Sequence, residues 1–274
     1  MDTSKSTEKK LFKAQSQKYY YLDREKITKE YQHAWAIAGT RLQKMFNELH
    51  DVRLNPHRGF LWLRTDIITP SFDSMNFSYK NKVFSVLIDF IDENGDSMIS
   101  DNKKNIQLEV AENNNLIPCL FKIHIDNMQP LSEDWNLVDA RSGEAIIPQE
   151  MGSDEPTPKS KWEMNSWGIS VARKALVNEK YKILSYTDAP GMTPQIWFEN
   201  IVGEKCWALV QVTVNGIVLE TMDPVALAKQ IGSDFRGYTS QVEFAAVDST
   251  ELIYRNGPAA LSYGGLQEIR INDD

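Results

Sequence analysis

The acidic run at residues 92–96, Asp-Glu-Asn-Gly-Asp, has the residue types of a calcium-binding loop. Alternate oxygen-bearing side chains around a glycine can wrap a hard cation. A complete loop of this type also needs a glycine at its sixth position and a glutamate at its twelfth, and the sequence supplies neither. We therefore expect Asn94 and Gly95 to form a β-turn after a buried strand.

The four histidines, His33, His50, His57 and His124, do not have the spacing of a zinc site. No two of them have the separation that metal ligands need on one helix face, and His124 with Asp126 would supply only two ligands from one strand. We expect surface or capping roles for these histidines. The residues alone therefore predict no metal site and no cofactor.

Local signatures of common enzymes are missing from the sequence. It contains no Gly-x-Ser-x-Gly elbow, no glycine-rich loop between a strand and a helix, and no Gly-Lys-Ser/Thr phosphate loop. Its two cysteines, Cys119 and Cys206, each lie in an apolar run, where a thiol behaves as a small buried hydrophobe. This usage fits a reducing compartment.

Composition limits the class of partner. The chain has 274 residues, of which 42% are apolar, so it has ample material for buried cores. Its 30 basic and 38 acidic residues give a net charge of −8, which repels polyanions and does not favour nucleic acid. We find no run of about 18 apolar residues and no secretory signal, so we expect a cytoplasmic protein that does not contact a membrane.

Hydrophobic periodicity predicts an α/β protein with mixed sheets (α+β). In the first half, a helical period covers residues 24–50, and continuous or alternating apolar residues predict strands at 60–65, 72–79, 83–91 and 117–125, with a helix at 102–113 before the last strand. In the second half, helices are expected at 162–178 and after Asp223-Pro224, and strands at 181–186, 195–199, 206–214 and 241–247. Both halves therefore have the order α-β-β-β-α-β.

Matching residues in the two halves predict a tandem duplication. Trp35, Ile37 and Arg41 correspond to Trp167, Ile169 and Arg173 at an offset of 132, Thr69-Pro70 corresponds to Thr193-Pro194, and residues 82–87 correspond to 205–210 at an offset of 123. We interpret the tryptophans as packing each helix onto its sheet, and the arginines as covering an edge. The predicted organisation is a disordered or partner-ordered tail at 1–18, a first unit at 19–147, a linker at 148–161 and a second unit at 162–274.

This element order resembles the core of the restriction-endonuclease-like, or PD-(D/E)XK, superfamily, here in two tandem copies. The resemblance implies an acid near the start of the second core strand and an acid-x-Lys on the third, which together hold Mg²⁺ or Mn²⁺ beside an attacking water. In the first copy Asp66, Asp73 and Asp89 are available, but Ile91 occupies the place of the lysine. In the second copy Glu199 ends the second strand, and the third strand offers neither acid nor lysine, only Gln211 and the preceding Lys205. Both copies look degenerate.

These observations favour a non-enzymatic binding or assembly protein made of two related units, with a protein partner or self-association. The alternative is a metal-dependent nuclease, or a degenerate nuclease-like protein that binds nucleic acid, working through Asp66, Asp73 and Asp89. A third reading, an enzyme whose acidic site is assembled across the linker, has no specific residue in its favour.

Overall fold

The computed structural model describes residues 28–49, 60–64, 75–188, 191–247, 251–255 and 257–270. The predicted tail at 1–18 and the Thr69-Pro70 pair lie outside these residues. The chain forms two compact units, of which the first runs from Glu25 to Thr157 and the second includes residues 158–274. Each unit combines helices with one mixed β-sheet, so the fold is of the α+β class. In the described part of the chain, no helix is both long and apolar enough to cross a membrane.

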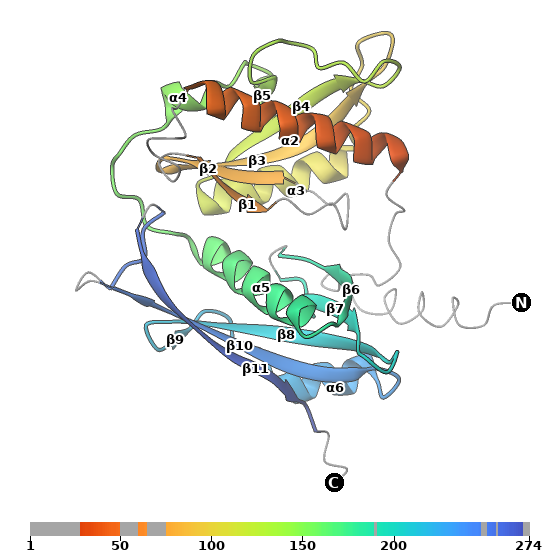
Figure 1. Cartoon of the computed structure of the whole chain (residues 1–274), viewed down its shortest axis with the longest axis vertical. Helices are drawn as coiled ribbons and strands as arrows, with labels where there is room; N and C mark the ends of the chain where they lie inside the picture. Colours follow the sequence, from red (N-terminus) through yellow and green to blue (C-terminus); the bar gives the residue numbers. More distant parts are fainter. Residues whose placement is uncertain are drawn as a thin grey trace, which may run out of the picture. The chain divides into compact units, whose positions relative to one another are not determined.

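The first unit has a five-stranded sheet in the order β1-β2-β3-β4-β5. Strands β3 and β4 are parallel and are joined by helix α3, whereas the other neighbours are antiparallel (Figure 1). The elements are α2 (Lys29–Leu49), β1 (Phe60–Arg64), β2 (Met75–Tyr79), β3 (Lys82–Ile91), α3 (Asp101–Asn114), β4 (Ile117–His124), β5 (Leu137–Asp139) and the short α4 (Pro148–Met151).

Strand β3 is buried on both faces, as its continuous apolar run predicts. Phe84, Val86 and Ile88 belong to one core cluster with the apolar residues of α2. Alternation along the strand turns Ser85 toward the other face. There the Gln107 side chain of α3 donates hydrogen bonds to the carbonyl oxygens of Ser85, at 2.6 Å, and of Cys119, at 3.1 Å. Helices α2 and α3 therefore cover opposite faces of the sheet.

Residues 148–157, which we expected to form part of an exposed linker, pack against the first unit. They contain α4, and Ser153 exchanges two hydrogen bonds with the side chain of Asn81 in the β2–β3 turn. The Asn81 amide also donates to Thr157 Oγ1 at 3.3 Å. Asn81 is itself buried, so this amide fixes the segment to the end of the sheet.

The second unit has a sheet in the order β6-β7-β8-β10-β11, with β9 paired to β8. Strands β8 and β10 are parallel and are joined by α6, and the other pairs are antiparallel (Figure 1). The elements are α5 (Lys161–Asn178), β6 (Lys182–Tyr186), β7 (Ile196–Glu199), β8 (Lys205–Val214), β9 (Ile217–Val218), α6 (Pro224–Ile231), β10 (Arg236–Ala246) and β11 (Ala259–Glu268).

Side-chain caps begin both helices of the second unit. Helix α5 starts with a capping box, in which Ser160 accepts from the Glu163 backbone and Glu163 accepts from the Ser160 backbone. Helix α6 starts at Pro224, and the Asp223 carboxylate accepts from the backbone N–H groups of Val225 and Ala226. The Asp-Pro pair predicted this second helix start.

The two units share one topology but not one side-chain register. Both have the predicted α-β-β-β-α-β order, followed by an antiparallel edge strand, β5 or β11. In β3, Phe84 packs in the core cluster under α2, the helix that precedes the sheet. Trp207, its counterpart at an offset of 123, packs instead with the crossover helix α6. The sequence match therefore puts equivalent side chains on opposite faces, and common origin by duplication stays a prediction that rests on the shared topology.

Replacing two helical glycines with alanine should have opposite effects on the free energy of unfolding. A methyl group at Gly168 of α5 would collide with the Val212 side chain of β8, whereas the nearest atom to a methyl group at Gly39 of α2 is Met75 Cε at 3.7 Å. We expect Gly168→Ala to lower the free energy of unfolding by about 1–3 kcal/mol. We expect Gly39→Ala to raise it by up to about 1 kcal/mol, because alanine favours helix.

Urea denaturation of both variants, followed by far-ultraviolet circular dichroism, checks this expectation. Stabilisation by Gly168→Ala would show that α5 does not lie as close to β8 as described.

Candidate functional site

Of the three carboxylates that the nuclease resemblance implies, Asp66 and Asp73 lie outside the described residues and Asp89 lies within them. Asp89 is on β3 and is fully buried. Its Oδ1 accepts hydrogen bonds from the Ser97 hydroxyl at 2.7 Å and from the Ile99 backbone at 3.3 Å. This carboxylate therefore fixes the start of the crossover from β3 to α3.

Two features of Asp89 bear on whether it could take part in the chemistry that the nuclease resemblance implies. Its second oxygen, Oδ2, is buried and makes no hydrogen bond. In the parallel pairing of β3 with β4, Asp89 is the register partner of Lys122, which places the two residues on the same face. The restriction-endonuclease-like pattern has its lysine two residues after the acid on one strand. Lys122 could not be found from local spacing, because only the pairing of β3 with β4 makes it the register partner of Asp89.

The other candidate metal ligands within the described residues do not converge, and His50 and His57 lie outside these residues. The Asp92 carboxylate accepts from the backbone N–H groups of Asn94 at 2.9 Å and Asp96 at 2.8 Å, which forms the predicted turn after β3. These hydrogen bonds, the one from Asp96 first, lower the pKa of Asp92. Within the ranges that the structure describes, no three His, Cys, Asp or Glu side chains are grouped closely enough to hold a metal ion.

Both cysteines are buried thiols, as expected. Burial raises the pKa of Cys119 well above its usual value, and the nearby Asp139 charge raises it further. Burial, with a smaller contribution from Glu204, raises the pKa of Cys206 to about 11. These shifts favour the protonated thiol over the thiolate, which is the reactive species, at neutral pH.

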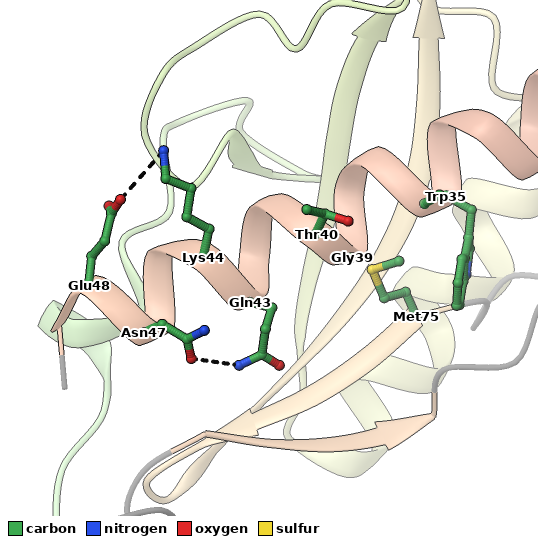
Figure 2. A pocket seen from close by; sticks show the side chains of 9 residues that line it. Trp35, Gly39, Thr40, Gln43, Lys44, Asn47, Glu48 and Met75 are labelled. Atoms are coloured by element: carbon green, nitrogen blue, oxygen red, sulfur yellow. Dashed lines mark hydrogen bonds and ion pairs between the residues drawn. The ribbon is translucent and has the colours of Figure 1, made fainter. Parts of the chain in front are cut away.

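An open groove of about 740 Å³ runs along α2 (Figure 2). The Trp35 ring stands beside the helix, and the Met75 side chain of β2 lies next to it, close to Gly39 (Figure 2). The lining residues are Trp35, Ala36, Gly39, Thr40, Gln43, Lys44, Asn47, Glu48 and Met75.

The position of the groove follows from how α2 packs. A stripe of apolar residues at four-residue spacing faces the core, namely Ala34, Ala38, Leu42 and Phe46. About 100° around the helix on one flank, Arg41 donates to the carbonyl oxygens of Asp134 at 3.0 Å and Ser132 at 3.4 Å, so a loop is held there. The groove residues Gly39 and Gln43 lie on the opposite flank, about 100° the other way.

The groove changes in character along its length. At one end the lining is apolar, because Trp35 and Met75 flank the bare backbone of Gly39. At the other end the polar side chains pair with each other. Gln43 Nε2 donates to Asn47 Oδ1 at 3.0 Å, and Lys44 Nζ lies 3.5 Å from Glu48 Oε1 (Figure 2). An apolar centre beside a polar rim is the usual composition of a protein interface.

The predicted counterparts in the second unit have different surroundings. The Trp167 ring packs against the Phe244 ring in a tilted arrangement, with ring centroids 4.5 Å apart, and the Lys159 amine lies 5.4 Å from the Trp167 ring centroid. The Arg173 guanidinium lies over the Tyr186 ring at 4.9 Å. Trp35 packs against the core of the first unit as expected, but it also lines the groove. The small residues on the outer flank of α2 are the sequence signal that would have indicated the groove.

A buried ion pair holds the start of α5. Arg255 and Glu163 form two parallel bonds, Nε to Oε1 at 3.0 Å and Nη2 to Oε2 at 2.9 Å, with side chains 2% and 3% exposed. Lys159 lies beside this pair, and burial lowers its pKa. The arrangement joins α5 to residues 253–255, because the Lys159 backbone also donates to the Ile253 carbonyl. A bidentate pair with this geometry is a structural clamp.

Substitutions at Asp89 test whether its carboxylate holds the crossover from β3 to α3. If the carboxylate fixes the crossover, Asp89→Ala leaves the Ile99 N–H without its partner, and we expect the free energy of unfolding to fall by about 1–3 kcal/mol. Asp89→Asn keeps one acceptor oxygen and should stay within about 1 kcal/mol of the parent. Asp96→Ala, at an exposed carboxylate in the same loop, is the matched control. Equal losses in all three variants, measured by urea denaturation, would contradict this role.

The thiols give a test of burial. Because a pKa of about 11 leaves roughly one Cys206 side chain in a thousand as thiolate at pH 8, we expect Cys206 to react with a disulfide reagent at least about a hundred times more slowly in the native chain than in urea. Cys119 should behave in the same way. Rapid native labelling of either thiol, followed by absorbance, would show that it is accessible.

Comparison with protein-family models gives a match within the second unit. A family model described as a domain of unknown function, DUF8840, matches residues 162–269. These residues extend from the first turn of α5 to the residue just after β11. No curated protein and no solved structure matches the chain.

Proposed function

We propose that the protein is a non-enzymatic binding or assembly protein, and that the groove along α2 holds a protein partner. The observation that carries this proposal is the apolar centre of the groove, formed by Trp35, Gly39 and Met75, on a helix whose other flank is already covered. The titratable side chains at its far end, Lys44 and Glu48, pair with each other. Nothing in this lining is arranged for proton transfer or nucleophilic attack.

The groove fits an amphipathic helix of the partner. It extends from Trp35 to Glu48, which is about 20 Å along α2 at 1.5 Å per residue. Ala36, Gly39 and Thr40 are small, so a second helix can approach to the axial distance of about 8–10 Å at which helices pack. Trp35 would then supply the large aromatic contact that often dominates an interface. The partner helix needs a mainly apolar contact stripe, because the one charged pair of the groove is internally balanced.

The thiols support the proposed location. Cys119 and Cys206 are free and buried, and we propose that the protein works in the cytoplasm, where thiols stay reduced.

The alternative function is a metal-dependent nuclease, or a degenerate nuclease-like protein that binds nucleic acid. The observation in its favour is Asp89, whose buried Oδ2 makes no hydrogen bond, beside Lys122 on the neighbouring strand. This alternative requires Asp66 and Asp73 to converge on Asp89 around Mg²⁺ or Mn²⁺. Calorimetric titration with Mn²⁺ distinguishes the two: binding that Asp89→Asn abolishes would favour the nuclease.

Site-specific photo-crosslinking in the native host tests the binding function. A photoreactive residue at Thr40, which is exposed and lines the groove, should give a defined adduct with one protein. The same residue at Glu112, which is exposed on α3, should not give that adduct. Filling the groove with Ala36→Trp should reduce the Thr40 adduct at least about tenfold, because Ala36 is exposed and its replacement leaves the core intact.

Equal adducts from Thr40 and Glu112, or a Thr40 adduct that Ala36→Trp does not change, would contradict the proposed groove interface.

A further inference from the structure

Strand β11 is a long sheet edge. It has ten residues and, among the described strands, pairs only with β10. The pairing joins Ala259–Glu268 to residues 238–246 of β10 in antiparallel register. In Figure 1 it is the dark blue strand at the border of the second sheet. Within the described part of the chain, no strand pairs with its outer backbone N–H and C=O groups, which can therefore accept another strand.

Apart from one bulge, this edge lacks the usual devices that keep an edge from pairing. Such edges normally carry charged residues or proline, or are short. From Ala259 to Gln267 the strand has neither a charged residue nor a proline. The opposite edge of the same sheet, β6, has only five residues and begins at Lys182, which forms an ion pair with Glu199 at 3.6 Å. The contrast marks β11 as the edge suited to strand addition.

The side chains of β11 suit a second copy of the same strand. Leu261 pairs with Phe244 of β10 and Leu266 pairs with Ser240, so both leucines point to the α5 face. Leu261 is 49% exposed, although it is apolar. A bulge lies between them, where Gly264 and Gly265 oppose a single β10 residue and Gly265 takes a φ of 78°.

We propose that two copies of this chain associate through β11, in antiparallel register about a twofold axis at Tyr263. In this register Leu261 of one copy lies opposite Leu266 of the other, on the same face. The two bulge glycines, Gly264 and Gly265, take one pairing position, so Tyr263 of one copy lies opposite Tyr263 of the other. The twofold axis repeats the leucine contact, and the two sheets become one continuous sheet.

The strength of this association follows from the area. One strand edge buries less surface than a standard protein interface, so the dissociation constant should be in roughly the micromolar range. Each chain carries a net charge of −8, so the copies repel each other and added salt should strengthen the dimer. This inference concerns a different surface from the α2 groove and does not depend on the function proposed for that groove.

Sedimentation velocity of the full chain between about 1 and 200 μM is the first test, and we expect dimer to accumulate with concentration. Leu261→Lys should weaken the dimer at least about tenfold, because it places a charge opposite an apolar side chain. Val202→Lys is the matched control, since Val202 is 73% exposed on the β7–β8 turn of the same unit. A parent that stays monomeric at 200 μM, or a dimer that Leu261→Lys does not weaken, overturns the proposal.

A disulfide test fixes the register and does not depend on the behaviour of the lysine variant. The double variant Leu261→Cys with Leu266→Cys should form a covalent dimer under mild oxidation. The two positions are about 16 Å apart along one strand, too far for a bond within one copy. Each single variant should give little covalent dimer, because its cysteine faces a leucine. Native Cys119 and Cys206 are buried and contribute little background. Equal dimer from the single and double variants would show that the strands do not pair in this way.

Discussion

Both units depend on one central strand that is buried on two faces. In β3, Phe84 and Val86 pack under α2, and the alternate residues face the crossover side. In β8, Val212 meets α5, and Trp207 meets α6. A strand with two apolar faces needs a helix on each side, and the parallel neighbour that follows it requires a long crossover. The layers of each unit, and with them the exposed outer flank of α2, follow from this constraint.

The elements that could be predicted from the sequence are those with long apolar runs. The strand expected at 83–91 is Lys82–Ile91, and the helix expected at 102–113 is Asp101–Asn114. Strand β11 was not expected, because its sequence contains two consecutive glycines and few β-branched residues. It forms by pairing with β10, and such pairing leaves little local signal. The same is true of β5 and β9, which have three and two residues.

The candidate sites likewise combine features that could be predicted from the sequence with features that depend on the folded chain. Asp89 was expected on the third strand and lies there, but its bond to Ser97 depends on the path of the crossover, which no local pattern encodes. The core contact of Trp35 was expected, whereas the groove beside it exists because no element covers that flank. The match of residues 82–87 with 205–210 predicted equivalent positions. A shift of one residue reverses the face of every side chain on a strand, and the structure has that shift.

The clamp between Glu163 and Arg255 has a consequence for synthesis of the chain. The two residues are 92 positions apart, and each is the charged partner that makes burial of the other favourable. While the chain is being made, Glu163 leaves the ribosome several seconds before Arg255 at ordinary elongation rates of about 5–20 residues per second. During that interval Glu163, at the start of α5, lacks the Arg255 counter-charge. The second unit therefore completes its fold only when nearly its whole length has emerged.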